Sequence, residues 1–166
     1  MRWPGGRNDI LIRAKQSLLS LFPNDDPSTA CLGQHNEVGV LAIMPSQQDR
    51  KILEEATKSD RWHLWATQNW TESVVILEKH TPTIVLLNRN SLGSDWRDLL
   101  RFLLLPKHLC CIVLTTATTG DRFCEQFLVE GGYEVLRTPL RSSEVVEALQ
   151  RASVYWQKCL ALAYGY

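Results

Sequence analysis

The chain has 166 residues, of which 45% are hydrophobic and 22% are charged, and 18 basic side chains balance 18 acidic ones. This length allows one domain with a full core, and a neutral chain has no bulk electrostatic attraction for nucleic acid or an anionic membrane, although a local basic patch is compatible with that balance. No apolar run reaches the roughly 20 residues of a membrane span, and no signal sequence is evident. We therefore expect a cytoplasmic protein with neither a nucleic-acid nor a membrane partner.

The cysteines and histidines suggest no catalytic or metal chemistry. The cysteines are odd in number, and none stands at metal-ligand spacing from another cysteine or a histidine. Two of them lie inside an apolar run, where cysteine usually packs as a small hydrophobe. We expect reduced core thiols, no metal, no cofactor and no catalytic residue. The cysteines are Cys31, Cys110, Cys111, Cys124 and Cys159.

Residues 1–37 are expected to form an N-terminal extension. Within it, residues 10–22 have the periodicity of a short amphipathic helix, and residues 23–37 are rich in turn formers and suggest a linker. The apolar face of the predicted helix consists of Leu11, Ala14, Leu18 and Leu21.

From residue 38 the pattern changes to short apolar runs that alternate with helical periodicity. Such alternation predicts an α/β fold, a five-stranded parallel sheet with helices on both faces in a three-layer sandwich. Thr71 is a plausible cap for the second of these helices. Strands are predicted at 38–43, 62–67, 83–88, 109–116 and 133–138, and helices at 47–59, 71–80, 94–105, 120–130 and from 142 onward.

Three segments resemble motifs of the receiver domain of bacterial response regulators. PTIVLLNRNSLG (82–93) resembles the strand and loop around the phosphoacceptor aspartate, and VLTTA (113–117) resembles the strand that ends in Thr/Ser-Ala. GGYEVLRTP (131–139) resembles the segment that runs from Gly-Ala to Lys-Pro. With the order of strands and helices, the resemblance covers residues 38–152. It implies a flavodoxin-like (CheY-like) strand order.

The resemblance also assigns positions to single residues. Asn88 stands at the phosphoacceptor aspartate and Thr116 at the switch hydroxyl. Thr138 stands at the lysine, just before a proline that follows a cis peptide bond in the family. Met44 and Pro45 stand at the acidic pair that holds Mg²⁺ in the family.

Four of these five positions depart from the family's chemistry. Met44 and Pro45 supply none of the hard oxygen ligands that Mg²⁺ needs. Asn88 is a poor nucleophile, and Thr138 cannot balance a phosphoryl charge as a lysine would. Only Thr116 keeps its chemistry. We therefore predict a degenerate pocket that does not undergo Mg²⁺-dependent aspartyl phosphorylation.

Other polar groups near the strand ends have two interpretations. A threonine cluster precedes a predicted helix, where it could bind an anion or only form caps and turns. Arg89 and Arg137 are either solvated or fill the vacated pocket in a pair with Asp95 or Glu134. The threonines are Thr115, Thr116, Thr118 and Thr119, and the tryptophans expected to pack in the core are Trp62, Trp65, Trp70 and Trp96.

The last helix is predicted to run from 142 to 163, beyond the usual end of a receiver domain, so residues 153–166 form an extension of it. An apolar seam recurs along it at 4-3-4-3-4 spacing. Its far end could dock on the N-terminal helix, a second subunit or another protein. The resemblance makes a homodimer plausible. The predicted interaction surface comprises Val145, Leu149, Ala152, Tyr155, Trp156, Cys159 and Leu160.

The sequence therefore suggests a receiver-like protein-interaction module in phosphorelay or two-component-type signalling that is neither phosphorylated nor an enzyme. Two alternatives stay open. One is a small-molecule-binding α/β protein or enzyme that uses the crevice at the strand ends. The other is a divergent but active phosphoacceptor receiver.

Overall fold

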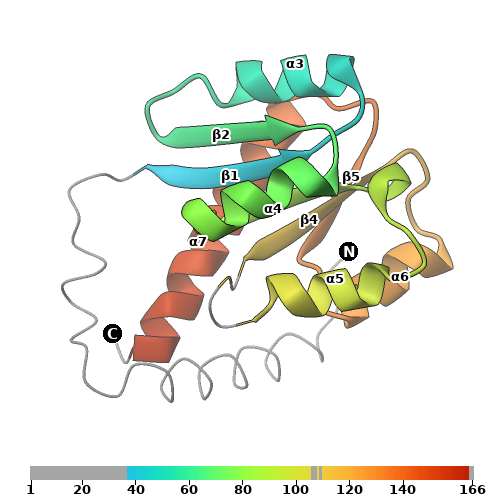
Figure 1. Cartoon of the computed structure of the whole chain (residues 1–166). Coiled ribbons are helices and arrows are strands. Elements are labelled where there is room, and N and C mark those ends of the chain that lie inside the picture. The colour runs from blue at the N-terminus through green and yellow to red at the C-terminus, as the bar shows by residue number, and fades with distance from the viewer. Residues whose placement is uncertain (1–36, 106–107, 109, 165–166) are drawn as a thin grey trace.

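A five-stranded parallel sheet forms the centre of the molecule (Figure 1). The computed structural model describes residues 37–105, 108 and 110–164, so the predicted helix at 10–22 lies outside the described residues. The strand order is β2-β1-β3-β4-β5, and every neighbouring pair is parallel. The strands are β1 (Val38–Ile43), β2 (Trp62–Thr67), β3 (Ile84–Asn88), β4 (Cys111–Thr116) and β5 (Glu134–Arg137). This confirms the predicted α/β fold and its flavodoxin-like order.

Helices cover both faces of the sheet and keep here the labels of Figure 1. They are α3 (Gln47–Ala56), α4 (Trp70–Lys79), the 3₁₀ turn η1 (Arg89–Ser91), α5 (Trp96–Leu103), α6 (Arg122–Val129) and α7 (Ser142–Tyr164). The helices α3 and α7 pack on one face, and α4, α5 and α6 pack on the other. None of the described helices is both long enough and apolar enough to cross a membrane.

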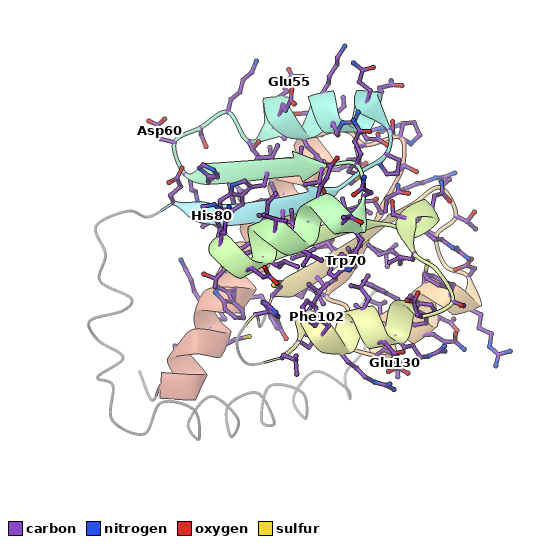
Figure 2. All side chains as sticks on the ribbon, viewed as in Figure 1. Glu55, Asp60, Trp70, His80, Phe102 and Glu130 are labelled. Atoms are coloured by element: carbon purple, nitrogen blue, oxygen red, sulfur yellow. The ribbon has the colours of Figure 1, made fainter. Side chains whose placement is uncertain are left out.

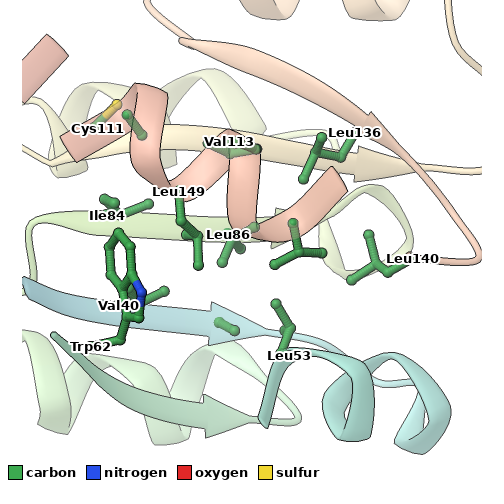
Figure 3. Close-up of a cluster of buried hydrophobic side chains, with 14 of the residues drawn as sticks. Val40, Leu53, Trp62, Ile84, Leu86, Cys111, Val113, Leu136, Leu140 and Leu149 are labelled. Carbon is green, nitrogen blue, oxygen red and sulfur yellow. The ribbon is translucent and has the colours of Figure 1, made fainter. Parts of the chain in front are cut away.

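Alternate residues of each strand feed the two hydrophobic clusters, as the two-residue period of a strand requires. Val40 and Leu86 face α3 and α7, where they meet Leu53 and Leu149 (Figure 3). Their chain neighbours face the other helices. All five residues of β3 are buried, because the central strand has neighbours on both edges and helices on both faces.

The predicted elements from residue 38 onward are all present; β1 and β2 have the predicted bounds, and other elements have shifted ends. The strand β4 begins at Cys111 because the Cys110 N–H donates to the Leu103 carbonyl at the end of α5 instead of joining the ladder. The helix α4 is capped by Asn69, whose side chain accepts from the Glu72 N–H at 3.0 Å, so the prediction of Thr71 as its cap was wrong. An asparagine at this position satisfies a backbone donor that the helix leaves unpaired.

Candidate functional site

The carboxyl ends of the strands meet along one edge of the sheet, which we call the carboxyl edge. In a parallel sheet with helical crossovers this is where ligands and chemistry are expected. The register pairs Asn88 with Thr115 and Thr116 with Arg137. The residues at the ends of β1, β3, β4 and β5 are therefore neighbours, as the sequence predicted.

Asn88, Thr115 and Met44 form a chain of contacts inside this edge. Asn88 is 7% exposed, and its Nδ2 donates to Thr115 Oγ1 at 3.3 Å. The Thr115 hydroxyl lies 3.6 Å from Met44 Sδ, and both side chains are fully buried. Asn88 Oδ1 accepts from the Asn90 N–H at 2.9 Å. The polar atoms of the predicted acceptor position are thus used within the protein.

Thr115 did not figure in the pocket predicted from sequence. Its hydroxyl links β3 to β1, whereas the pocket prediction took only Thr116, because the motif marks the last hydroxyl of the strand. The signal in the sequence was the two-residue period of a strand: Thr115 and Thr116 point to opposite faces of the sheet, so only one of them can meet Met44, and in the structure it is Thr115.

Thr116 and Thr138 are joined through their backbones. The Thr138 N–H donates to the Thr116 carbonyl at 2.9 Å, and the Thr138–Pro139 bond is cis, as the resemblance implied. The buried Thr116 hydroxyl is held within its own turn, where it lies 3.2 Å from both the N and the O of Thr118. The hydroxyl of Thr116 therefore serves in turn formation, the structural interpretation of the threonine cluster.

Two residues of α3 organise the carboxyl edge and were missed from sequence. Arg50 Nη1 donates to the carbonyls of Met44 and Pro45 at 2.6 and 2.8 Å. Asp49 is 6% exposed, and its Oδ1 accepts from the Leu140 N–H at 3.1 Å. The available signal was the spacing Ser46-x-x-Asp49, a capping pattern, and Ser46 does cap α3.

Arg89 has a partner other than the two that were considered. Its Nη1 lies 2.6 Å from Asp121 Oδ2, and its guanidinium stacks on the Phe123 ring, so pairing with Asp95 or Glu134 was wrong. The Arg89 hydrogen bond, followed by the Cys124 N–H, lowers the pKa of Asp121 from 3.8 to about 2. The Asp121 carboxylate also caps α6, so its two oxygens bind the Cys124 N–H and the Arg89 guanidinium.

Remaining predictions near the core have mixed outcomes. Glu134 is bound by Arg151 of α7 at 2.6 Å, and Arg137 is exposed. Trp62 and Trp96 are buried as expected, whereas Trp65 and Trp70 are half-buried, the latter against Phe102 (Figure 2). Four cysteines are free and buried, namely Cys110, Cys111, Cys124 and Cys159. Cys31 lies outside the described residues.

The donors at the carboxyl edge do not fit Mg²⁺. They are a thioether, an amide, hydroxyls engaged with neighbours, carbonyls that already bind Arg50, and the carboxylate of Asp49, which accepts from the Leu140 N–H. Magnesium needs carboxylate or similarly hard oxygens in octahedral geometry. Among the residues that the structure describes, no group of three or more His, Cys, Asp or Glu side chains is placed to hold a metal ion.

The seam of α7 lies mainly inside the domain. Val145, Leu149 and Ala152 belong to the core cluster, and Cys159 is 8% exposed, so these four do not form a free interaction surface as predicted. The same spacing that marks a docking stripe also marks the face a helix buries against its own sheet. Two other predicted members are half-buried, namely Tyr155, which packs on Tyr133 with ring centroids 4.6 Å apart, and Trp156. The Leu160 side chain lies outside the described part.

No family model matches the chain, and no curated protein matches it. Solved structures do match. A response regulator from Thermotoga maritima has a TM-score of 0.64 at 14% identity, covering 70% of this chain and 97% of that chain. The chemotaxis protein CheY4 of Vibrio cholerae has a TM-score of 0.61 at 14% identity, with coverages of 70% and 98%.

An orphan response regulator from H. pylori is similar to the same extent, with a TM-score of 0.61 at 8% identity and coverages of 71% and 98%. The chain therefore has the fold of CheY-like response-regulator receiver domains. At these identities the similarity concerns the fold, and the chemistry of the chain has to be argued from its own carboxyl edge.

Proposed function

We propose that this chain is a receiver-like interaction module of two-component-type signalling that acts in the cytoplasm without being phosphorylated and without catalysing a reaction. The observation that carries the proposal is the lack of charge at the positions that the resemblance assigns to the phosphoacceptor and to a Mg²⁺ ligand. Met44 and Asn88 stand where the resemblance expects acids, and both contact Thr115. Neither side chain supplies a carboxylate nucleophile or a carboxylate ligand for Mg²⁺, and the buried carboxylate of Asp49 on α3 already accepts from the Leu140 N–H at 3.1 Å.

Intact mass spectrometry tests the absence of phosphorylation. The purified chain is incubated with Mg²⁺ and acetyl phosphate beside a receiver of known activity. We expect the control to gain one phosphoryl group and this chain to gain none. A gain of one phosphoryl group by this chain, at any residue, contradicts the proposal and favours the divergent phosphoacceptor.

The same proposal assigns the interaction surface to the second half of α7, at Tyr155, Trp156 and Leu160. The supporting observation is that Tyr155 and Trp156, two large aromatic side chains, are only half-buried. The occupant is a protein partner or a second copy of the chain. Aromatic side chains contribute much of the binding energy at protein interfaces.

Light scattering after size-exclusion chromatography, run over a range of concentrations, tests the second copy. We expect Trp156→Ala to weaken self-association and Gln157→Ala, an exposed neighbour on α7, to leave it unchanged. A chain that self-associates equally in both variants contradicts this surface. A chain that stays monomeric at all concentrations contradicts the homodimer.

A further inference from the structure

The first turn of α3 connects two loops of the carboxyl edge that are far apart in the sequence. Arg50 binds the β1–α3 loop through the carbonyls of Met44 and Pro45, at 2.6 and 2.8 Å. The preceding residue, Asp49, binds the β5–α7 loop through the Leu140 N–H at 3.1 Å. Two adjacent side chains thus fasten both loops to one rigid helix.

The Arg50 contact resembles the coordination of a cation. Two carbonyl oxygens converge on one guanidinium nitrogen, and hydrogen bonds from a charged donor are about twice as strong as neutral ones. A guanidinium also keeps its charge at any pH a protein meets. The positive charge at this point of the edge is therefore part of the chain and does not depend on a dissolved ion.

The Asp49 contact is buried and directional. The carboxylate is 6% exposed, and Leu140, whose N–H it accepts, is 5% exposed. Removal of the acceptor would leave a buried N–H without a partner, which costs more than the bond itself contributes. Leu140 lies between the cis Thr138–Pro139 bond and the start of α7, so Asp49 also fixes how α7 begins.

We propose that Asp49 and Arg50 form a latch that holds the carboxyl edge in one arrangement whether or not a metal ion or a phosphoryl-like anion is present. The surface of α7 is then presented constitutively, because the loop that leads into it does not respond to a ligand. The constitutive presentation of α7 rests on the proposed function, since it takes α7 as the interaction surface. The hydrogen bonds that form the latch do not depend on that function.

Hydrogen exchange of the full-length chain, followed by mass spectrometry, tests the latch in residues 44–48 and 138–142. Wild-type protein is compared without additive, with Mg²⁺ alone, and with Mg²⁺ plus beryllofluoride, a phosphoryl mimic. We expect the same exchange in all three conditions. Faster or slower exchange of either loop with an additive overturns the proposal, since it shows a second arrangement that a ligand selects.

Variants locate the latch. We expect Arg50→Ala to speed exchange in residues 44–48 and Asp49→Ala to speed it in residues 138–142, each about tenfold or more, since hydrogen bonds to charged groups contribute more than neutral ones. Asp49→Asn keeps an acceptor oxygen and should have a smaller effect, which keeps the test valid if Asp49→Ala does not fold. Lys51→Ala, an exposed neighbour on the same helix, is the matched control.

The outcomes separate the latch from the proposed function. If Arg50→Ala and Asp49→Ala both exchange like the Lys51→Ala control, the latch is wrong, whatever the phosphodonor experiment shows; where Asp49→Ala does not fold, Arg50→Ala and Asp49→Asn decide. If the wild-type chain gains a phosphoryl group while the variants loosen the loops as expected, the proposed function is wrong and the latch is a structural feature of an active receiver.

Discussion

Replacement of Asn88 by aspartate restores the carboxylate that the resemblance expects and tests whether the carboxyl edge is built for a neutral group. Asn88 is 7% exposed and donates from Nδ2 to Thr115 Oγ1. An ionised aspartate cannot donate, so the Thr115 hydroxyl has to reverse its role, and the new charge is buried at a position that is 7% exposed. We expect Asn88→Asp to lower the free energy of unfolding by about 1–3 kcal/mol at pH 7.5.

The penalty should depend on pH with a definite sign. Burial raises the pKa of an aspartate above its unfolded value of about 3.9. Below that value the group is protonated in both states and the penalty is absent, and the penalty grows as the pH rises through the higher, folded pKa. Urea unfolding at pH 4 and pH 7.5 measures this difference, with the exposed Asn90→Asp as control. If Asn88→Asp is as stable as the wild type at pH 7.5, the edge is able to compensate a carboxylate and the neutral-edge reasoning fails.

Three further predictions concern packing and titration. An added Cβ at Gly132 would lie 2.1–2.7 Å from three ring atoms of the buried Phe127, so Gly132→Ala should lower the free energy of unfolding in urea by about 1–3 kcal/mol. The control is Gly93→Ala, whose added Cβ meets only the exposed Asp95 carboxylate and should lower that free energy by less than about 0.5 kcal/mol. The pKa of Asp121 in the folded protein is lowered to about 2, so the stabilising effect of its carboxylate should be lost as the pH falls from 4 to 2. The free energy of unfolding of Asp121→Asn should therefore depend less on pH over that range than that of the wild type. An unchanged pH dependence would contradict the pairing with Arg89. Burial raises the pKa of the Cys110 thiol to about 12, so iodoacetamide at pH 8 should modify it only after unfolding, and rapid labelling of native protein would contradict its burial.

The sheet and its helices could be predicted because each strand is a short apolar run bounded by turn formers. The run at Val38–Ile43 and the run at Trp62–Thr67 both match the structure in full. A strand buried on both faces, such as β3, needs such a run, whereas the edge strand β2 is apolar at most positions although His63 and Ala66 are exposed. Strand order followed from the resemblance, since periodicity does not say which strands are neighbours.

The candidate site could be predicted only as a set of positions. The sequence placed Met44 and Asn88 at the same edge, but the contacts through Thr115 depend on side-chain direction within the sheet. Arg50 and Asp49 were missed because they contact carbonyls and an N–H of loops, and such backbone partners leave no trace in residue spacing. The pairing of Arg89 with Asp121 was missed for a similar reason, since the two residues meet only through the fold.

Residues that differ from the receiver motif fit the side chains that contact them in this chain. The motif's Gly-Ala becomes Gly131-Gly132, and the ring of Phe127 fills the space that the alanine methyl would need. Where the resemblance expects an acid, Met44 places a thioether 3.6 Å from the Thr115 hydroxyl, and where it expects the phosphoacceptor, Asn88 donates to the same hydroxyl at 3.3 Å. A carboxylate without its lysine, or an alanine beside Phe127, would be destabilising alone, because a buried charge needs a partner and a filled core has no room for a methyl group. A single substitution toward the receiver motif, such as Asn88→Asp, is therefore not expected to give a receiver's chemistry, since Met44 and Thr138 do not supply the acid and the lysine that the resemblance expects beside it.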